Sequence, residues 1–416
     1  MRPNAAAAAA PQREAVRAST ARAVPQATSV GVPIAQPAPP RAPIAAPAPT
    51  HVQRLTLVAQ PPAPAPVPDT VERPDRSIQV GQVVCWQFAV VAVGAATAGS
   101  RTALILTSFA AVSLVLLTAI RIRGLWLYRW LGVLLGFLVR RRRIDLGDGI
   151  AINLVSAFLG RTGTDEVVVR EQPYGVLSRP TGASVALRLG ADAQHKVLHR
   201  LGSLADSADE QPVEVGVQLV LHTGVKQNQP PRAWIAVAAE RTPDIATDEQ
   251  LRQVLANTVR RLVRRFDRED IECMPLDESD VLASLGALAH ANAGRGMIHE
   301  RWSTWSCGPV RQLCVRLTGS ASLPAATVQA LAGALLGTGT GAAQTIAITV
   351  TAAADHSAPL RHDAVLRLAA SHPATLDSAY SVLTTLARSF GVEPERLDGR
   401  HATGVAATLP LGVPLS

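Results

Sequence analysis

Residues 103–120 read ALILTSFAAVSLVLLTAI, an apolar run that decides the architecture of the chain. As a helix it has nearly the roughly 20 residues needed to cross about 30 Å of hydrocarbon. A second apolar run at 80–98 precedes it after a link of four residues. The first run contains Gln82 and Gln87, but its small residues suit close packing against a neighbouring helix. The sequence therefore predicts a transmembrane hairpin within 77–120.

Arginine is unevenly distributed around this hairpin. Arg73 and Arg76 precede it, the link contains Arg101 alone, and seven arginines follow within residues 121–143. Because loops rich in Lys and Arg stay in the cytoplasm, both termini are expected to be cytoplasmic. The hairpin then places the protein in the cell inner membrane and leaves only a short turn on the far side.

The net charge of +8 is also divided unevenly. Residues 1–143 hold sixteen Arg and four acidic residues, giving +12, so the remainder carries −4. A slightly acidic domain does not attract phosphate backbones over long range. We therefore expect no nucleic-acid partner, and we assign the basic excess to membrane topology and to anionic lipid of the bilayer.

Residues 1–76 are rich in Ala and Pro, with scattered Arg and no helical or strand periodicity. Such a segment buries too little apolar surface to offset its ordering entropy, so a disordered cytosolic tail is expected. The alternative is a true start codon further downstream. A cleavable signal peptide is not expected, because the first apolar run comes too late.

Aromatic and basic residues alternate directly after the hairpin, in Arg121-Ile-Arg-Gly-Leu-Trp-Leu-Tyr-Arg-Trp130. The apolar stretch 131–139 and four further arginines follow. Trp and Tyr settle at the headgroup level and Arg can reach lipid phosphates. An interfacial helix over 121–143 is therefore predicted, with membrane contacts by Trp126, Tyr128, Trp130, Arg140, Arg141, Arg142 and Arg143. A third crossing by 131–139 is the alternative, but it would leave the arginine run outside.

The remaining residues, 144–416, alternate between strand and helix patterns and predict a cytosolic α/β (α+β) domain. Preliminary strands are expected at Ile150–Val155, Glu166–Arg170 and Gly175–Ser178. The order β-α-β-β-α-β then appears twice, at about 184–277 and 312–409. The expected elements of the first copy are Ser184–Leu189, Asp192–Leu204, Val213–Leu221, Ala233–Ala239, Asp248–Phe266 and Ile271–Met274. Those of the second are Gln312–Leu317, Ala325–Leu336, Gln344–Thr351, His362–Leu368, Ala374–Phe390 and a segment ending at Leu409.

Two of these helices show clear amphipathic faces. One face gathers Leu251, Leu255, Thr258, Leu262 and Phe266, and the other gathers Leu376, Tyr380, Leu383, Leu386 and Phe390. Thr247 and Gln250 predict a capping box for the first helix. The repeated order predicts two similar halves built by duplication of a split β-α-β unit.

Motifs that would carry chemistry are weak. Gly337–Gly341 is glycine-rich but follows a helix and lacks the Lys of a phosphate loop, so it is interpreted as a turn. His195 and His199 lie one helical turn apart without a third ligand, which favours a solvated helix face. Asp277–Asp280 suits the start of a helix. We therefore expect no metal, cofactor or catalytic residue.

Other candidates concern packing and partners. The four cysteines form no CxxC pair and are expected to be reduced. Arg260, Arg264 and Arg268 form a stripe that is either solvated or faces an acidic partner or lipid. Trp302 and Trp305 are candidate interface anchors. The alternative is that both pack the domain core.

The order of hairpin, aromatic segment, Arg140–Arg143 and Glu300-Arg-Trp-Ser-Thr-Trp305 resembles the EccE family of actinobacterial type VII (ESX) secretion systems. The resemblance covers about residues 80–416, although 131–139 is more apolar than that family suggests. It implies a structural subunit that supports protein export across the inner membrane beside EccB, EccC and EccD, with EccC supplying the ATPase. The rival function is a membrane-tethered enzyme, glycosyltransferase-like or lipid-modifying, or a degenerate enzyme fold acting as an adaptor. A single-component signalling adaptor is a third class.

Overall fold

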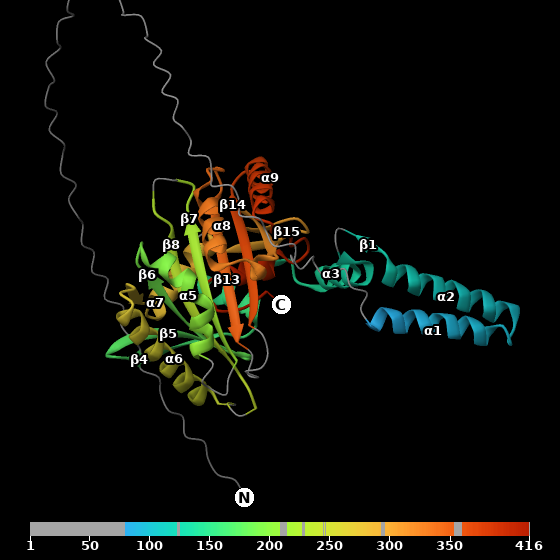
Figure 1. Cartoon of the computed structure of the whole chain (residues 1–416), viewed down its shortest axis with the longest axis horizontal. Helices are drawn as coiled ribbons and strands as arrows, with labels where there is room; N and C mark the ends of the chain where they lie inside the picture. The colour runs from blue at the N-terminus through green and yellow to red at the C-terminus, as the bar shows by residue number, and fades with distance from the viewer. Residues whose placement is uncertain are drawn as a thin grey trace, which may run out of the picture. The chain divides into compact units, whose positions relative to one another are not determined.

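The computed structural model describes residues 80–416, apart from 123–124, 209–213, 227–228, 244, 246, 293–295, 353–359 and 416. The expected Ala/Pro-rich tail at 1–76 lies outside the described residues. Helices, strands and their order are shown in Figure 1.

Two antiparallel helices open the described chain, α1 (Val80–Ala96) and α2 (Arg101–Ala119). Their polar groups pair with each other: Gln82 Nε2 donates to the Thr118 carbonyl at 2.8 Å, and Trp86 Nε1 donates to Thr118 Oγ1 at 2.8 Å. The amide of Gln82 is thus satisfied where water is excluded, which explains a polar residue in an apolar helix. Among the described helices, α2 alone is both long and apolar enough to cross a membrane, and α1 is shorter.

The segment after the hairpin is less helical than predicted. Arg121–Ile122 (β1) pairs with Leu125–Trp126 (β2), and the helix α3 covers only Leu127–Val139. Backbone pairing thus replaces the first turns of the predicted helix, and Arg143 already belongs to strand β3 (Arg143–Asp145). With 13 residues, α3 is about 20 Å long, which is shorter than the roughly 30 Å of a hydrocarbon core.

A large antiparallel sheet forms the centre of the α/β domain. Its strands run in the order β3-β10-β11-β12-β14-β13-β7-β8-β6-β5-β4, with β15 beside β12 and β9 beside β6. The strand bounds are β4 Gly163–Val169, β5 Gln172–Arg179, β6 Gly182–Leu189, β7 Val215–Thr223, β8 Arg232–Glu240, β9 Cys273–Pro275, β10 Met297–Glu300, β11 Trp305–Cys307, β12 Val310–Thr318, β13 Ala343–Ala352, β14 Arg361–Ala370 and β15 Glu393–Arg396.

The order of pairing occurs twice in this sheet. In the first half it is β7-β8-β6-β9, and in the second it is β13-β14-β12-β15. The inner strands β7 and β13 pair with each other, for example at Leu219 and Ile348, and so join the halves into one sheet. Each half has the connections of a split β-α-β unit.

Helices cover both faces of the sheet. The first face carries α5 (Ala193–Ala208), α6 (Asp248–Arg268), α8 (Ala325–Gly337) and α9 (Pro373–Ser389), and Figure 1 shows α5 and α8 over β7 and β13. The second carries α4 (Ile150–Leu159), α7 (Glu278–Ala289) and α10 (His401–Ala407). A short 3-10 helix covers Ser320–Ser322. Because both faces are covered, the residues of the central strands β7 and β13 are almost continuously buried.

The local signals in α6 and α7 are confirmed. The predicted face of α6 is buried, and Thr247 and Gln250 form the expected capping box. Asp277 caps α7 by accepting from the backbone N–H of Asp280 at 2.8 Å.

The strand expected at Ile150–Val155 is wrong, because this stretch is the helix α4. Leu154 and Val155 are fully buried on one side of α4, which packs against α7 and α10. A short apolar run does not by itself distinguish a buried helix from a buried strand.

Candidate functional site: the junction of α3 with the sheet

Helix α3 meets the α/β domain at a cluster of side chains that we call the anchor junction. It consists of Trp130, Phe137 and Arg140 from α3 and its end, Glu300 from the end of β10, and Trp302 from the loop between β10 and β11. Strand β3 brings the chain to this place, since Ile144 pairs with Ile298 of β10. Segments far apart in sequence thereby come into direct contact.

Aromatic rings form the apolar part of the anchor junction. The ring centroids of Trp302 and Phe137 are 5.3 Å apart in an edge-to-face arrangement, and those of Trp302 and Trp130 are 5.8 Å apart. Such aromatic pairs stabilise a contact beyond the area that they bury. The indole also lies against Gly399, where an added Cβ would stand 2.6 Å from Cζ3 of Trp302. Gly399 has a φ of +74°, so both its conformation and this close approach favour glycine.

A carboxylate forms the polar part. Glu300 is 4% exposed, and its Oε2 accepts from Arg140 Nη1 at 3.3 Å while its Oε1 accepts from the backbone N–H of Ala402 at 2.9 Å. The backbone N–H of Glu300 donates to the carbonyl of Arg142 at 2.8 Å. One residue therefore connects the end of α3, strand β10 and helix α10. A buried carboxylate is tolerated here because each oxygen has a donor.

The predicted membrane-contact residues have different positions in the structure. The guanidinium of Arg121 lies 4.0 Å from the ring centroid of Trp126, which is the N-cap of α3. Tyr128 is half-buried. Of the arginine run, Arg140 binds Glu300, Arg142 lies over the ring of Phe137 at 5.3 Å, and Arg143 belongs to β3, whereas Arg141 is exposed.

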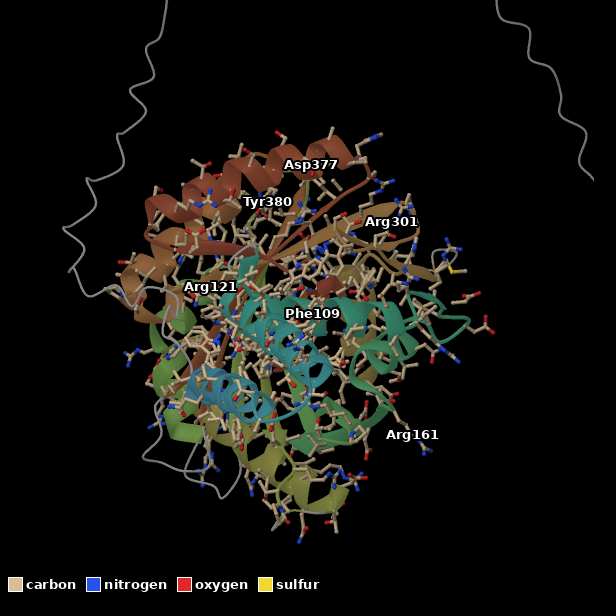
Figure 2. The ribbon with its side chains drawn as sticks, turned by 90° about the vertical axis from the view of Figure 1, so that its right-hand side faces the viewer. Phe109, Arg121, Arg161, Arg301, Asp377 and Tyr380 are labelled. Atoms are coloured by element: carbon tan, nitrogen blue, oxygen red, sulfur yellow. The ribbon has the colours of Figure 1, made fainter. Side chains whose placement is uncertain are left out.

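The two candidate interface tryptophans also differ. Trp302 is half-buried in the anchor junction, whereas Trp305 is 1% exposed in the core of the second face. Trp305 packs on Phe158 of α4, with ring centroids 5.8 Å apart. Trp305 is therefore a core residue of the domain, as the alternative in the sequence analysis states. Arg301, which precedes Trp302 in the chain and is labelled in Figure 2, is exposed.

The weaker motifs lie elsewhere. His195 is exposed on α5 and its Nδ1 is 2.9 Å from Gln329 Nε2, and His199 is exposed on the same helix. No group of three or more His, Cys, Asp or Glu residues with metal-binding geometry occurs within the described ranges. The segment Gly337–Gly341 ends α8 and turns into β13, and Gln344 Nε2 donates to the Thr338 carbonyl at 2.8 Å.

One segment of the chain is similar to a known protein family. The matching family is described as "Putative type VII ESX secretion system translocon, EccE". Residues 229–317 match EccE. Comparison with curated proteins gives no match. The family resemblance inferred from the sequence is confirmed for this segment, and the EccE match indicates a component of a membrane-associated type VII secretion system.

The EccE match runs from the residues before β8 to the end of β12. It includes Glu300 and Trp302 but not α3. The anchor junction is therefore made by side chains of the EccE segment and by a helix outside it. Glu300 stood in the motif that carried the resemblance, but its partner Arg140 could not be identified from sequence, because 160 residues separate the two.

Proposed function

We propose that this chain is a structural subunit of the type VII secretion membrane complex, and that it supports protein export by holding its α/β domain beside the other membrane subunits. It has no catalytic role of its own in this proposal. The observation that carries it is the anchor junction, which joins the EccE segment to the helix that follows the membrane hairpin.

The surface of the hairpin supports a membrane anchor with two crossings. Large apolar side chains project outward from both helices, among them Phe88 at 69% exposure on α1 and Phe109 at 74% on α2, where Figure 2 labels it. Contiguous exposed apolar surface of this kind is unfavourable in water and suits hydrocarbon. The excess of Arg before and after the hairpin favours a cytoplasmic location for both the N-terminus and the C-terminus.

Helix α3 supports a position at the membrane surface. Phe137 is buried in the anchor junction, whereas Leu135, Leu138 and Val139 are 61%, 56% and 86% exposed. One side of α3 thus packs against the domain, and its exposed apolar residues are available to contact the lipid interface. Trp126, Tyr128 and the exposed Arg141 suit the headgroup level in the same proposal.

This arrangement suits positioning. A domain fixed to a membrane anchor has a raised effective concentration for membrane-bound partners, so modest contacts can be occupied. Subunits of the EccB, EccC and EccD types are the partners that we propose, together with the lipid bilayer.

Purification from mild detergent tests this function. The tagged full-length chain should migrate with a large complex that contains the other secretion subunits. Trp302→Ala should reduce secretion while the protein remains in the membrane, because the domain is released from α3. Arg301→Ala, which changes the exposed neighbour, should leave secretion unchanged. A full-length protein that runs as a free monomer, with the rest of the complex intact without it, would contradict the proposal.

A further inference from the structure

A cavity of about 290 Å³ lies on the second face of the sheet, between α7 and the strands β6, β7 and β8. We call it the α7 cavity. The strands contribute Arg188, His222, Arg232 and Trp234 to its lining, and α7 contributes Asp280 and Ser284. The cavity is separate from the anchor junction, because the two share no lining residue.

The strand register brings basic residues together at this cavity. Arg188 of β6 is the cross-strand partner of Trp234 on β8, and His222 of β7 is the partner of Arg232. The row continues from His222 to Thr345 on β13 and from Thr345 to Arg367 on β14. Arg367 of the second half therefore lies in the same cross-strand row as His222 and Arg232, although it does not line the cavity.

The positive charge is not neutralised by the protein. Arg188 and Arg232 are exposed at the rim and form no ion pair with any described residue. Arg367 is 1% exposed and donates to Gln312 Oε1, the Leu288 carbonyl and Thr345 Oγ1, without a carboxylate partner in the described part of the chain. Asp280 is the one acidic residue that lines the cavity. Positive groups focused in a concave site attract anions.

Trp234 and His222 form further parts of the cavity wall. Trp234 is 5% exposed, and its Nε1 has no acceptor within the described structure. A buried donor without an acceptor is costly, and the side chain that carries it lines the α7 cavity. His222 is held neutral, because burial and the neighbouring Arg367, His290 and Arg232 lower its pKa to about 3. It therefore adds no third charge at the wall and keeps its hydrogen bond with Thr345.

We propose that the α7 cavity binds a small molecule that carries a phosphate group, held by the guanidinium groups of Arg188 and Arg232. Guanidinium forks match the oxygens of a phosphate in pairs, and two forks match its double charge better than that of a single carboxylate. Asp280 and Ser284 are then available for hydroxyl groups on the rest of the ligand. The size of the cavity suits a small ligand rather than a peptide segment.

The full-length protein in a neutral detergent tests this site by calorimetric titration with inorganic phosphate and with glycerol 3-phosphate. Potassium chloride at matched ionic strength gives the baseline. Both phosphates should bind and raise the melting temperature above that baseline. Arg188→Gln and Arg232→Gln should each weaken binding roughly tenfold or more, as expected for a lost charged hydrogen bond.

Arg264→Gln on α6 is the matched control, because Arg264 is exposed on the opposite face and the same charge is removed. It should leave phosphate binding unchanged. Vesicles with and without phosphatidic acid distinguish the source of the phosphate. Arginine-dependent binding that is tighter to phosphatidic acid vesicles than to glycerol 3-phosphate assigns the group to a lipid headgroup, and the reverse order of affinities assigns it to a soluble metabolite.

Three results would overturn the proposal. These are phosphate binding that equals the chloride baseline, phosphate binding that both arginine variants retain, and arginine-dependent binding of an acidic peptide in place of phosphate. Equal melting temperatures of all variants without phosphate show that folding is not the cause of a loss. None of these results depends on assembly of the secretion complex.

Discussion

The indole of Trp302 meets the ring of Phe137 edge to face, with their centroids 5.3 Å apart and their planes at 90°. Phe137 belongs to the helix after the hairpin, and Trp302 belongs to the EccE segment. This contact is the apolar centre of the anchor junction, so changes at either ring test how the hairpin and the domain are connected.

Replacing the two tryptophans separately should give different results. Trp305→Ala removes a fully buried ring and should lower the free energy of unfolding by roughly 3–5 kcal/mol. Trp302→Ala should change the melting temperature of the domain much less, because this ring is half-buried at the edge. It should instead speed tryptic cleavage at Arg140–Arg143, since α3 is released. Equal losses of stability in both variants would contradict this distinction.

Gly399→Ala should weaken the anchor junction through steric overlap. The new Cβ would lie 2.6 Å from Cζ3 of Trp302 and 3.0 Å from Cγ1 of Val133. Overpacking of this kind costs about 1–3 kcal/mol, in addition to the strain of a positive φ. Gly391→Ala is the control, because Gly391 has a φ of +78° but nothing within 4 Å of the added atom. Chemical denaturation of the two variants measures the steric part as their difference, and identical midpoints would exclude it.

A double-mutant cycle tests the polar part. Glu300→Ala should destabilise more than Arg140→Ala, because Glu300 also accepts from the N–H of Ala402. The coupling energy between Glu300 and Arg140 should be about 1 kcal/mol or less, since the Arg140 side chain is 40% exposed and partly screened. Arg141→Ala should show no coupling with Glu300. A coupling with Arg141 as large as that with Arg140 would show that only the general charge of the run matters.

The topology of the hairpin can be tested by cysteine labelling in intact cells. In a Cys85→Ala background, a reagent that does not cross the membrane should modify a cysteine placed at Ser100, in the turn between the helices. It should not modify one placed at Ser416, because the C-terminus is expected in the cytoplasm. Labelling at Ser416 would refute the two-crossing topology.

The stability of the domain should fall in mild acid through His222. Its pKa is lowered to about 3 in the folded protein, chiefly by burial, against an ordinary value of 6.5. The unfolded chain therefore binds a proton first. The stability of the folded protein is therefore independent of His222 protonation above pH 6.5. Between pH 6.5 and pH 3 the free energy of unfolding falls by about 1.4 kcal/mol per pH unit. His222→Gln should flatten the dependence of unfolding free energy on pH in this window. Parallel curves for the two proteins would contradict the assignment.

Elements with a strong local signal could be predicted from the sequence. The amphipathic faces of α6 and α9, the capping box at Thr247 and the repeated order of strands and helices all follow from short-range patterns. The short apolar run Ile150–Val155 predicts a strand, but it forms a helix because α7 and α10, which are distant in sequence, cover one side of it. Propensity alone does not resolve such a case.

By itself, the sequence determined the apolar hairpin, the arginine asymmetry and the likeness to EccE, because each depends on residue type and spacing along the chain. Tertiary structure alone decided the sites. Arg140 meets Glu300 because the sheet pairs β3 with the distant strand β10, and Arg188, His222 and Arg232 gather at the α7 cavity because β6, β8 and β7 are neighbours in the sheet. Antiparallel register places each side chain on one face beside defined neighbours, and that register is set by long-range packing of both faces.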